Sequence, residues 1–231
     1  TISDVTITHN TSYNGGGILL WNSNPILDDV VITYNTAYNG GGGMVLEYSN
    51  PTLTDVTISN NTADENIDGG AHIVNSSPTF SNVNITHNSG GGMSLWYSDA
   101  HLDNVTIAYN TLGGGMNIYN NSNPTLTDVT ITHNTVDGMC GGMKIRNNSN
   151  PTLIDVNITN NTASSGGGGM CVWEESNPTL THVTIENNMA EKDNFSFLDQ
   201  PTELAMDNCA TFHVCCDKQL SIGDIKKSSN V

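Results

Sequence analysis

Apolar residues recur along the chain in a fixed order, at steps of 22 to 27 residues. A Val-x-Ile pair alternates with mostly polar positions, which is the two-residue period of a strand with one buried face. The valines of this pair are Val5, Val30, Val56, Val83, Val105, Val129, Val156 and Val183. The isoleucines are Ile7, Ile32, Ile58, Ile85, Ile107, Ile131, Ile158 and Ile185. The pattern predicts one equivalent strand in every repeat.

Two further apolar columns accompany this pair. The first follows a turn usually written Asn-Pro, because proline ends one strand before the next begins. It contains Leu27, Leu53, Phe80, Leu102, Leu126, Leu153 and Leu180. The second column follows a glycine run that ends at Gly17, Gly43, Gly70, Gly92, Gly115, Gly142 and Gly169. Glycine supplies a positive φ or a close backbone approach at little strain, so these runs mark bends. We expect three short strands in each coil.

An asparagine stands three positions after each isoleucine of the pair. This column is Asn10, Asn35, Asn61, Asn88, Asn110, Asn134, Asn161 and Asn188. Amides stacked about 4.8 Å apart can donate and accept hydrogen bonds up and down one axis. We therefore predict that the column forms a structural asparagine ladder inside the fold.

These patterns together specify an all-β fold, a parallel β-helix solenoid of about seven to eight three-stranded coils. We predict a repeat domain at 1–189 and an irregular capping segment at 190–231. The apolar residues expected to close the last coil are Phe195, Phe197, Leu198, Leu204 and Phe212. The chain starts directly with strand residues, so upstream coils or another subunit are expected at that end. End-to-end self-association into filaments would follow from an uncapped end.

The string Ile-Thr-Asn-Asn-Thr-Ala-Ser-Ser-Gly-Gly-Gly-Gly-Met from Ile158 to Met170 resembles the repeats of polymorphic outer-membrane proteins. Those repeats carry an aliphatic or aromatic residue three positions before Asn, followed by Gly-Gly and an apolar residue. The resemblance covers about residues 1–188 and implies a right-handed β-helix, the hand that parallel crossovers also favour. It further implies a surface adhesin, with distant pectate-lyase-like relatives that cut acidic polysaccharides.

The net charge of −17, with only six Lys or Arg, excludes nucleic acid as the expected partner. No stretch approaches the roughly eighteen unbroken apolar residues of a membrane span, so no membrane span is predicted.

Five cysteines leave at least one free or paired with another chain. They are Cys140, Cys171, Cys209, Cys215 and Cys216. Either they staple the C-terminal cap in an oxidising compartment or they are buried thiols, and the connectivity stays open. We expect an extracellular or cell-surface location.

The outward positions of the post-glycine strand show no pair of acids at the spacing that a glycoside hydrolase needs. Lys144 and Arg146 on one strand are the only candidates for a lyase acting on uronates, and the alternative is a solvated basic spot. His9, His87 and His133 fall in non-adjacent coils, too far apart to share a metal. We assign no catalytic residue and no metal site.

Aromatic side chains on the same outward positions form the candidate ligand-binding surface, which consists of Trp21, Trp96, Tyr119 and Trp173. Tyr48 and Tyr97 lie near the same edge. Aromatic rings stack on sugar faces or anchor protein contacts, because they bury a large area at little rotamer cost. The expected partners are glycans or cell-surface proteins. Alternatively, a neighbouring segment such as the tail covers these rings.

Two outward columns suggest other ligands. Acidic residues recur next to the Val column at Asp4, Asp29, Asp55, Asp103, Asp128 and Asp155, with Asn82 and His182 in the gaps. No cofactor is expected, although calcium would relieve repulsion among stacked carboxylates. Thr-x-Thr-like pairs on the Val-x-Ile strand resemble the face of β-helical ice-binding proteins, but Val31, Ala108 and Glu186 interrupt them.

From the sequence we therefore expect a non-catalytic extracellular structural or adhesive surface protein, with carbohydrate binding or filament formation as its activity. The first alternative is a polysaccharide lyase or glycoside hydrolase of the pectate-lyase-like type. The second is an ice-binding protein that uses its outward threonine columns.

Overall fold

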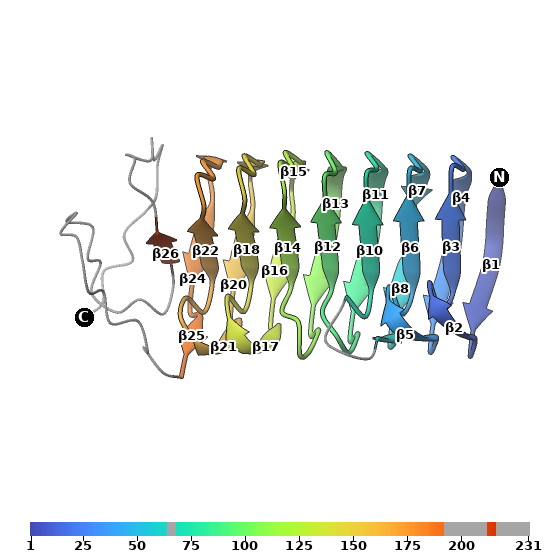
Figure 1. The fold of residues 1–231 in the computed structure, drawn as a ribbon, viewed down its shortest axis with the longest axis horizontal. Helices are drawn as coiled ribbons and strands as arrows, with labels where there is room; N and C mark the ends of the chain where they lie inside the picture. The colour runs from blue at the N-terminus through green and yellow to red at the C-terminus, as the bar shows by residue number, and fades with distance from the viewer. Residues whose placement is uncertain (64–67, 192–211, 216–231) are drawn as a thin grey trace.

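The computed structural model describes residues 1–63, 68–191 and 212–215. All regular secondary structure in these residues is β-strand, and all of the paired strands run parallel. Figure 1 shows the strands stacked side by side along one long axis, with the N-terminus at one end of the stack. The prediction of an all-β parallel solenoid is confirmed.

One side of the solenoid is a twelve-stranded sheet. It contains β1 (Ile2–Thr8), β4 (Ile26–Thr33), β7 (Thr52–Thr54), β8 (Thr57–Ser59), β11 (Thr79–Thr86), β13 (His101–Ala108), β15 (Thr125–Thr127), β16 (Thr130–Thr132), β19 (Thr152–Ile154), β20 (Asn157–Thr159), β23 (Thr179–Thr181) and β24 (Thr184–Glu186). The Leu column and the Val-x-Ile pair share this sheet. In β4, β11 and β13 they lie on one continuous strand, and in the later repeats and at β7 and β8 they lie on two successive strands.

The second side is an eight-stranded sheet built from the segments that follow the glycine runs. Its strands are β3 (Ile18–Trp21), β6 (Met44–Glu47), β10 (Ala71–Val74), β12 (Met93–Trp96), β14 (Met116–Tyr119), β18 (Met143–Arg146), β22 (Met170–Trp173) and β26 (Phe212–Cys215). The predicted capping segment at 190–231 lies outside the described residues, apart from 190–191 and β26. Four of the predicted capping residues lie there too, and they are Phe195, Phe197, Leu198 and Leu204.

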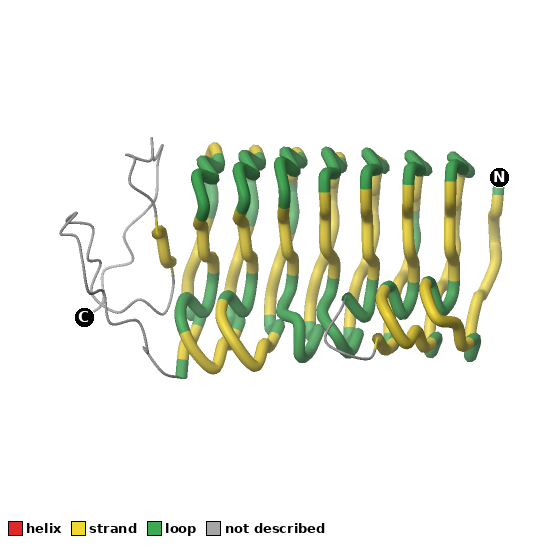
Figure 2. The backbone as a smooth tube through the Cα atoms, in the orientation of Figure 1, coloured by secondary structure: helices red, strands yellow, loops and turns green. Residues whose placement is uncertain are grey.

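Short strands after the asparagine column form the third side, which the apolar pattern did not reveal. They are β2 (Thr11–Asn14), β5 (Thr36–Gly40), β9 (Thr62–Ala63), β17 (Thr135–Met139), β21 (Thr162–Ser165) and β25 (Met189–Ala190). In the fourth and fifth coils this side shrinks to isolated bridges at Ser89 and Thr111. Figure 2 shows the loops of successive coils stacked at the corners.

The recurring Asp before the Val column has a backbone explanation. These residues have φ between 51° and 56°, in the left-handed region that Asp and Asn tolerate better than most side chains. They are Asp4, Asp29, Asp55, Asn82, Asn104, Asp128, Asp155 and His182. In the fifth coil the position belongs to Asn104, one residue after the Asp103 that we assigned to the column. The column therefore marks a kink between the two halves of the long strand.

The apolar columns stack residue upon residue inside the solenoid. The register pairs Val5 with Val30 and Ile7 with Ile32, and likewise pairs Leu27 with Leu53 in the next coils. The side chains of the inner coils are fully buried, and Phe80 is among the largest. Because no coil can cover its own apolar side, the core exists only as a stack.

The asparagine side chains form a hydrogen-bonded ladder along the axis. In the middle of it, the Asn61 backbone N–H and Nδ2 both donate to Asn88 Oδ1, at 2.9 and 3.1 Å. Asn61 Nδ2 also donates to the Ile32 carbonyl at 2.9 Å. Each buried amide thus satisfies backbone groups of the corner that would otherwise lack partners.

A second ladder, of serines, stands at the opposite corner and was missed by the sequence analysis. The Ser49 backbone N–H donates to Ser76 Oγ at 2.9 Å, and Ser76 Oγ donates to the Val74 carbonyl at 2.8 Å. The buried members are Ser49, Ser76, Ser98, Ser122, Ser149 and Ser176. Their regular place before the Asn-Pro turn is a signal that the sequence contains.

We predict that Asn88→Ala lowers the free energy of unfolding by about 3 kcal/mol, because it removes the acceptor of Asn61 and the donor to the Ile58 carbonyl. Urea denaturation followed by circular dichroism measures the change. The exposed Thr79→Ala on the neighbouring strand β11 serves as control and should cost less than about 1 kcal/mol. Equal losses for the two variants would contradict a stabilising ladder.

Candidate functional site

The candidate site lies on the outer surface of β10, β12, β14 and β18, which we call the central face. Two outward columns of the eight-stranded sheet cross it in register. The first column contributes His72, Ser94, Asn117 and Lys144. The second contributes Val74, Trp96, Tyr119 and Arg146. Residues more than twenty positions apart in sequence therefore become neighbours across the strands.

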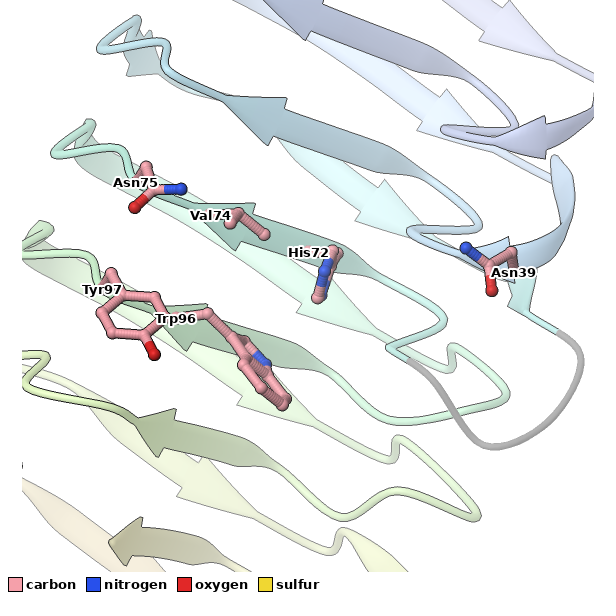
Figure 3. Close-up of a pocket in the computed structure, with 6 residues that line it drawn as sticks. All are labelled: Asn39, His72, Val74, Asn75, Trp96 and Tyr97. Atoms are coloured by element: carbon pink, nitrogen blue, oxygen red, sulfur yellow. The ribbon is translucent and has the colours of Figure 1, made fainter. Parts of the chain in front are cut away.

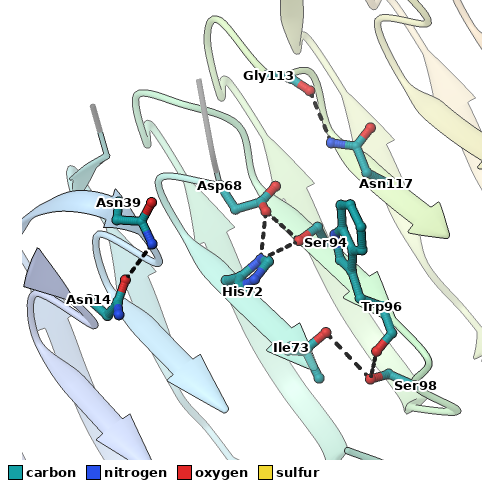
Figure 4. Close-up of polar contacts among 10 residues, drawn as sticks. All are labelled: Asn14, Asn39, Asp68, His72, Ile73, Ser94, Trp96, Ser98, Gly113 and Asn117. Carbon is teal, nitrogen blue, oxygen red and sulfur yellow. Dashed lines mark hydrogen bonds and ion pairs between the residues drawn. The ribbon is translucent and has the colours of Figure 1, made fainter. Parts of the chain in front are cut away.

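A buried carboxylate approaches the central face from the loop before β10. His72 Nδ1 lies 2.9 Å from Asp68 Oδ2 and 2.9 Å from Ser94 Oγ. The Ser94 hydroxyl donates to the same Asp68 oxygen (Figure 4). Asp68 is 5% exposed and Ser94 1% exposed, so the carboxylate and the hydroxyl are buried, whereas His72 is partly exposed. Both contacts are made by Nδ1, and the Nε2 atom of His72 makes no hydrogen bond to another described residue.

Sequence reasoning missed Asp68 as a site residue. It has a φ of 43° and lies four positions before His72, at the end of a segment that is not part of the repeat. Nine positions separate Asn61 from Gly70 in that coil, whereas four separate Asn88 from Gly92 in the next. Asp68 follows this longer segment and lies against Ser94 of the next coil.

Aromatic rings continue the face from His72. The ring of Trp96 lies edge-on to His72, with centroids 6.4 Å apart, and edge-on to Tyr119 at 5.1 Å. The guanidinium of Arg146 stacks over Tyr119, with Cζ 4.4 Å from the ring centroid. Edge-to-face and cation–π contacts of this kind hold the side chains in fixed orientations.

Only two of the four predicted aromatic ligands lie side by side. Trp96 and Tyr119 are direct partners in the register of β12 and β14. Trp21 lies on β3 opposite Glu47, with two strands between it and β12. Trp173 lies on β22, separated from Tyr119 by the strand that carries Arg146. The predicted surface is therefore one central pair and two outlying rings.

A shallow pocket of about 400 Å³ opens beside Trp96. Figure 3 shows its lining, which consists of Asn39, His72, Val74, Asn75, Trp96 and Tyr97. These residues come from three successive coils, and Asn39 reaches the pocket from β5 on the third side. The pocket combines aromatic and aliphatic walls with amide and imidazole groups that can donate and accept hydrogen bonds.

A family model described as a right-handed β-helix region matches residues 1–79 and 54–210. The chain belongs to the right-handed β-helix family. This membership agrees with the parallel strands of the structure and confirms the predicted fold and handedness. The closer likeness to polymorphic outer-membrane-protein repeats stays a prediction. Comparisons with curated proteins and with solved structures found no match.

The β-helix carries a disulfide between adjacent coils. Cys140 and Cys171 are bonded, with their Cα atoms 5.6 Å apart. Cys171 lies on β22, beside Lys144 in the register, so the bond ties the loop before β18 to the edge of the central face. Cys209 and Cys216 lie outside the described residues. The pairing could not be assigned from sequence, because the two positions occupy different columns of the repeat.

The electrostatics of the central face follow from burial. Burial, followed by the negative charge of Asp68, raises the pKa of the Tyr119 hydroxyl far above its usual value, although Arg146 opposes the change. Burial, followed by the charge of Arg146, lowers the pKa of the Lys144 ammonium, although Asp68 opposes this change. The Arg146 Nε is buried and makes no hydrogen bond to the described residues.

The remaining predicted features of the β-helix lie elsewhere. His9 stacks on Tyr34, and Tyr109 stacks between His87 and His133, with centroids 4.9 to 5.4 Å apart. Within the described ranges, no group of three or more His, Cys, Asp or Glu is arranged to hold a metal ion. No helix long and apolar enough to cross a membrane occurs in that part of the chain.

The outward threonines lie on the twelve-stranded sheet, on a different side of the solenoid from the central face. Thr132 Oγ1 and Thr159 Oγ1 are 3.1 Å apart, and Thr33 Oγ1 and Ser59 Oγ are 3.3 Å apart, so neighbouring hydroxyls bond along the axis. The left-handed residue in the middle of each long strand kinks this sheet. Outward threonine therefore also has a structural role within the sheet.

We predict that NMR titration of the Lys144 Cε signals gives a pKa below that of a lysine in water, and that Arg146→Gln raises it by removing a like charge. Because the folded-state pKa is lowered, the unfolded state binds more protons between the two pKa values. Stability should therefore rise with pH across that window. An unchanged Lys144 pKa in Arg146→Gln would contradict the coupling.

Proposed function

We propose that this right-handed β-helix is a non-catalytic extracellular structural or adhesive protein that binds carbohydrate on its central face. The observation that carries the proposal is the pocket beside Trp96, where an outward aromatic ring meets His72, Asn39 and Asn75. A pyranose ring has an apolar face and a rim of hydroxyls, which match this combination of stacking surface and hydrogen-bonding groups.

Preorganisation supports the same proposal. Trp96 is held from two sides by edge contacts with His72 and Tyr119, so little rotamer freedom remains to be lost when a ligand stacks on it. His72 is held in turn by Asp68 and Ser94. A ligand would meet rings that already have their bound orientation.

The extracellular part of the proposal is supported by covalent chemistry. The Cys140–Cys171 bond joins two coils, and structural disulfides persist in oxidising compartments. A net charge of −17 keeps such a rod soluble and disfavours adsorption to nucleic acid.

We predict that Trp96→Ala weakens glycan binding by at least about tenfold. The reason is that a stacking contact with an aromatic ring contributes on the order of 1.5 kcal/mol. Binding is measured on a glycan array and then by calorimetry with the glycans that respond. Trp21→Ala is the matched control, because it removes an exposed tryptophan from the same column far from the pocket. Equal binding by both variants and the parent would sink the proposal.

A second candidate function, cleavage of a polysaccharide, is favoured by the His72–Asp68 pair. A carboxylate at Nδ1 orients the imidazole and leaves Nε2 available as a general base or acid next to the Trp96 pocket. Ser94 does not fit the role of nucleophile, because it contacts Nδ1 and donates its proton to Asp68.

For this second candidate we expect the parent protein to generate unsaturated uronates, detected by ultraviolet absorbance, and His72→Gln to lose at least about 100-fold in rate through loss of general base catalysis. The exposed His182→Gln on the twelve-stranded sheet is the matched control and should retain full rate. No product from a broad polysaccharide panel would leave binding alone as the function.

A further inference from the structure

The described residues contain two lysines or arginines, and both belong to the central face. The whole chain has six, and the others, Lys192, Lys218, Lys226 and Lys227, lie outside the described residues. Lys144 and Arg146 are two positions apart on β18, so both side chains leave the same surface of the sheet. In a chain with a net charge of −17, this is a concentration of positive charge at one place.

Neither cation forms an ion pair with another described residue. The ion pairs of this part of the chain join His72 to Asp68 and His182 to Asp155. Arg146 instead lies over the ring of Tyr119, with its Nε buried and unbonded. Lys144 is half-buried beside Cys171 and Asn117. Two partly desolvated like charges on one strand repel, and no acid within ion-pair distance relieves them.

An oxyanion placed at this pair would relieve that repulsion and would satisfy the guanidinium. Arginine offers a planar fork of donors suited to carboxylate and sulfate, and lysine adds a compact point charge. The cation–π contact with Tyr119 fixes the plane of the guanidinium before any ligand arrives. Trp96 lies two strands away from Arg146, a distance of roughly 10 Å at the usual strand spacing.

We propose that Lys144 and Arg146 form a binding site for an oxyanion, a carboxylate or a sulfate, carried by the saccharide that stacks on Trp96. The ligand class of the central face is then an acidic oligosaccharide. This inference rests on the proposed carbohydrate binding and adds the chemical group that it recognises. Among the described residues, the attraction for an anion is concentrated at these two side chains, on a chain whose net charge is negative.

The test is calorimetry with three oligosaccharides of equal length: a hexuronate, a sulfated neutral sugar and the unmodified neutral sugar. Both anionic probes should bind at least about tenfold tighter than the neutral one, the size expected for a charge-assisted hydrogen bond. Stronger binding of one anionic probe identifies whether carboxylate or sulfate is the natural group. Lys144→Met and Arg146→Met should each remove most of this preference for the anionic probes over the neutral one.

Thr179→Asp is the matched control, because it changes the net charge by the same amount at an exposed position on the other sheet. Arg146→Lys keeps the charge and should retain part of the preference, which separates charge from packing on Tyr119. Circular dichroism shows whether each variant is folded. Equal affinity for all three probes, unaltered by the Met variants, would overturn the anion site while carbohydrate binding stands.

If no oligosaccharide binds, the proposed function fails, and the anion site is judged separately. Sodium sulfate is then titrated against the parent and Trp96→Ala, while NMR follows the side-chain signals of Lys144 and Arg146. The site is supported if the signals shift saturably in the parent and in Trp96→Ala, and if the Lys144 signals do not shift in Arg146→Met. The site is rejected if sulfate shifts the Lys144 signals of Arg146→Met as much as it shifts those of Thr179→Asp, which keeps both cations.

Discussion

Hydrogen bonding from coil to coil is the constraint on which the rest of this molecule depends. A short parallel strand has no partner within its own coil, so every backbone group of the sheets is satisfied by the coils before and after it. At the corners, where the sheets end, the asparagine and serine ladders continue the same bonding with side chains. The fold therefore needs nearly identical corners, and this need explains why those positions vary so little along the chain.

The same constraint produces the surface chemistry. When coils stack in register, each outward position becomes a column, and a column places side chains about one strand spacing apart whatever the distance in sequence. Rows of rings and hydroxyls follow directly, as the Trp96–Tyr119 contact and the Thr132–Thr159 bond illustrate. A β-helix thus offers a repetitive ligand a repetitive surface.

Departures from the repeat make the central face different from the rest of the rod. Coils four and five have the shortest segments between the asparagine and the glycine corner, and their third side has only bridges. The coils on either side are longer there, and they bring Asp68 to one edge of the face and the Cys140–Cys171 bond to the other. Carbohydrate binding and anion recognition are proposals that depend on these irregular parts, since the regular parts serve the fold.

The sequence by itself determined the repeat, the inward columns, the parallel β-helix and the outward positions of Trp96, Tyr119, Lys144 and Arg146. Each of these follows from a period, because the backbone pairing of one coil repeats in the next. Only the tertiary structure decided that Asp68 contacts His72, that Cys140 pairs with Cys171, and that the Leu and Val-x-Ile columns share one sheet. The first two contacts begin in segments between the asparagine and glycine corners, and the length of these segments differs from coil to coil, so the repeat alone does not fix their register. The third depends on a left-handed residue that turns the chain without taking it out of the sheet.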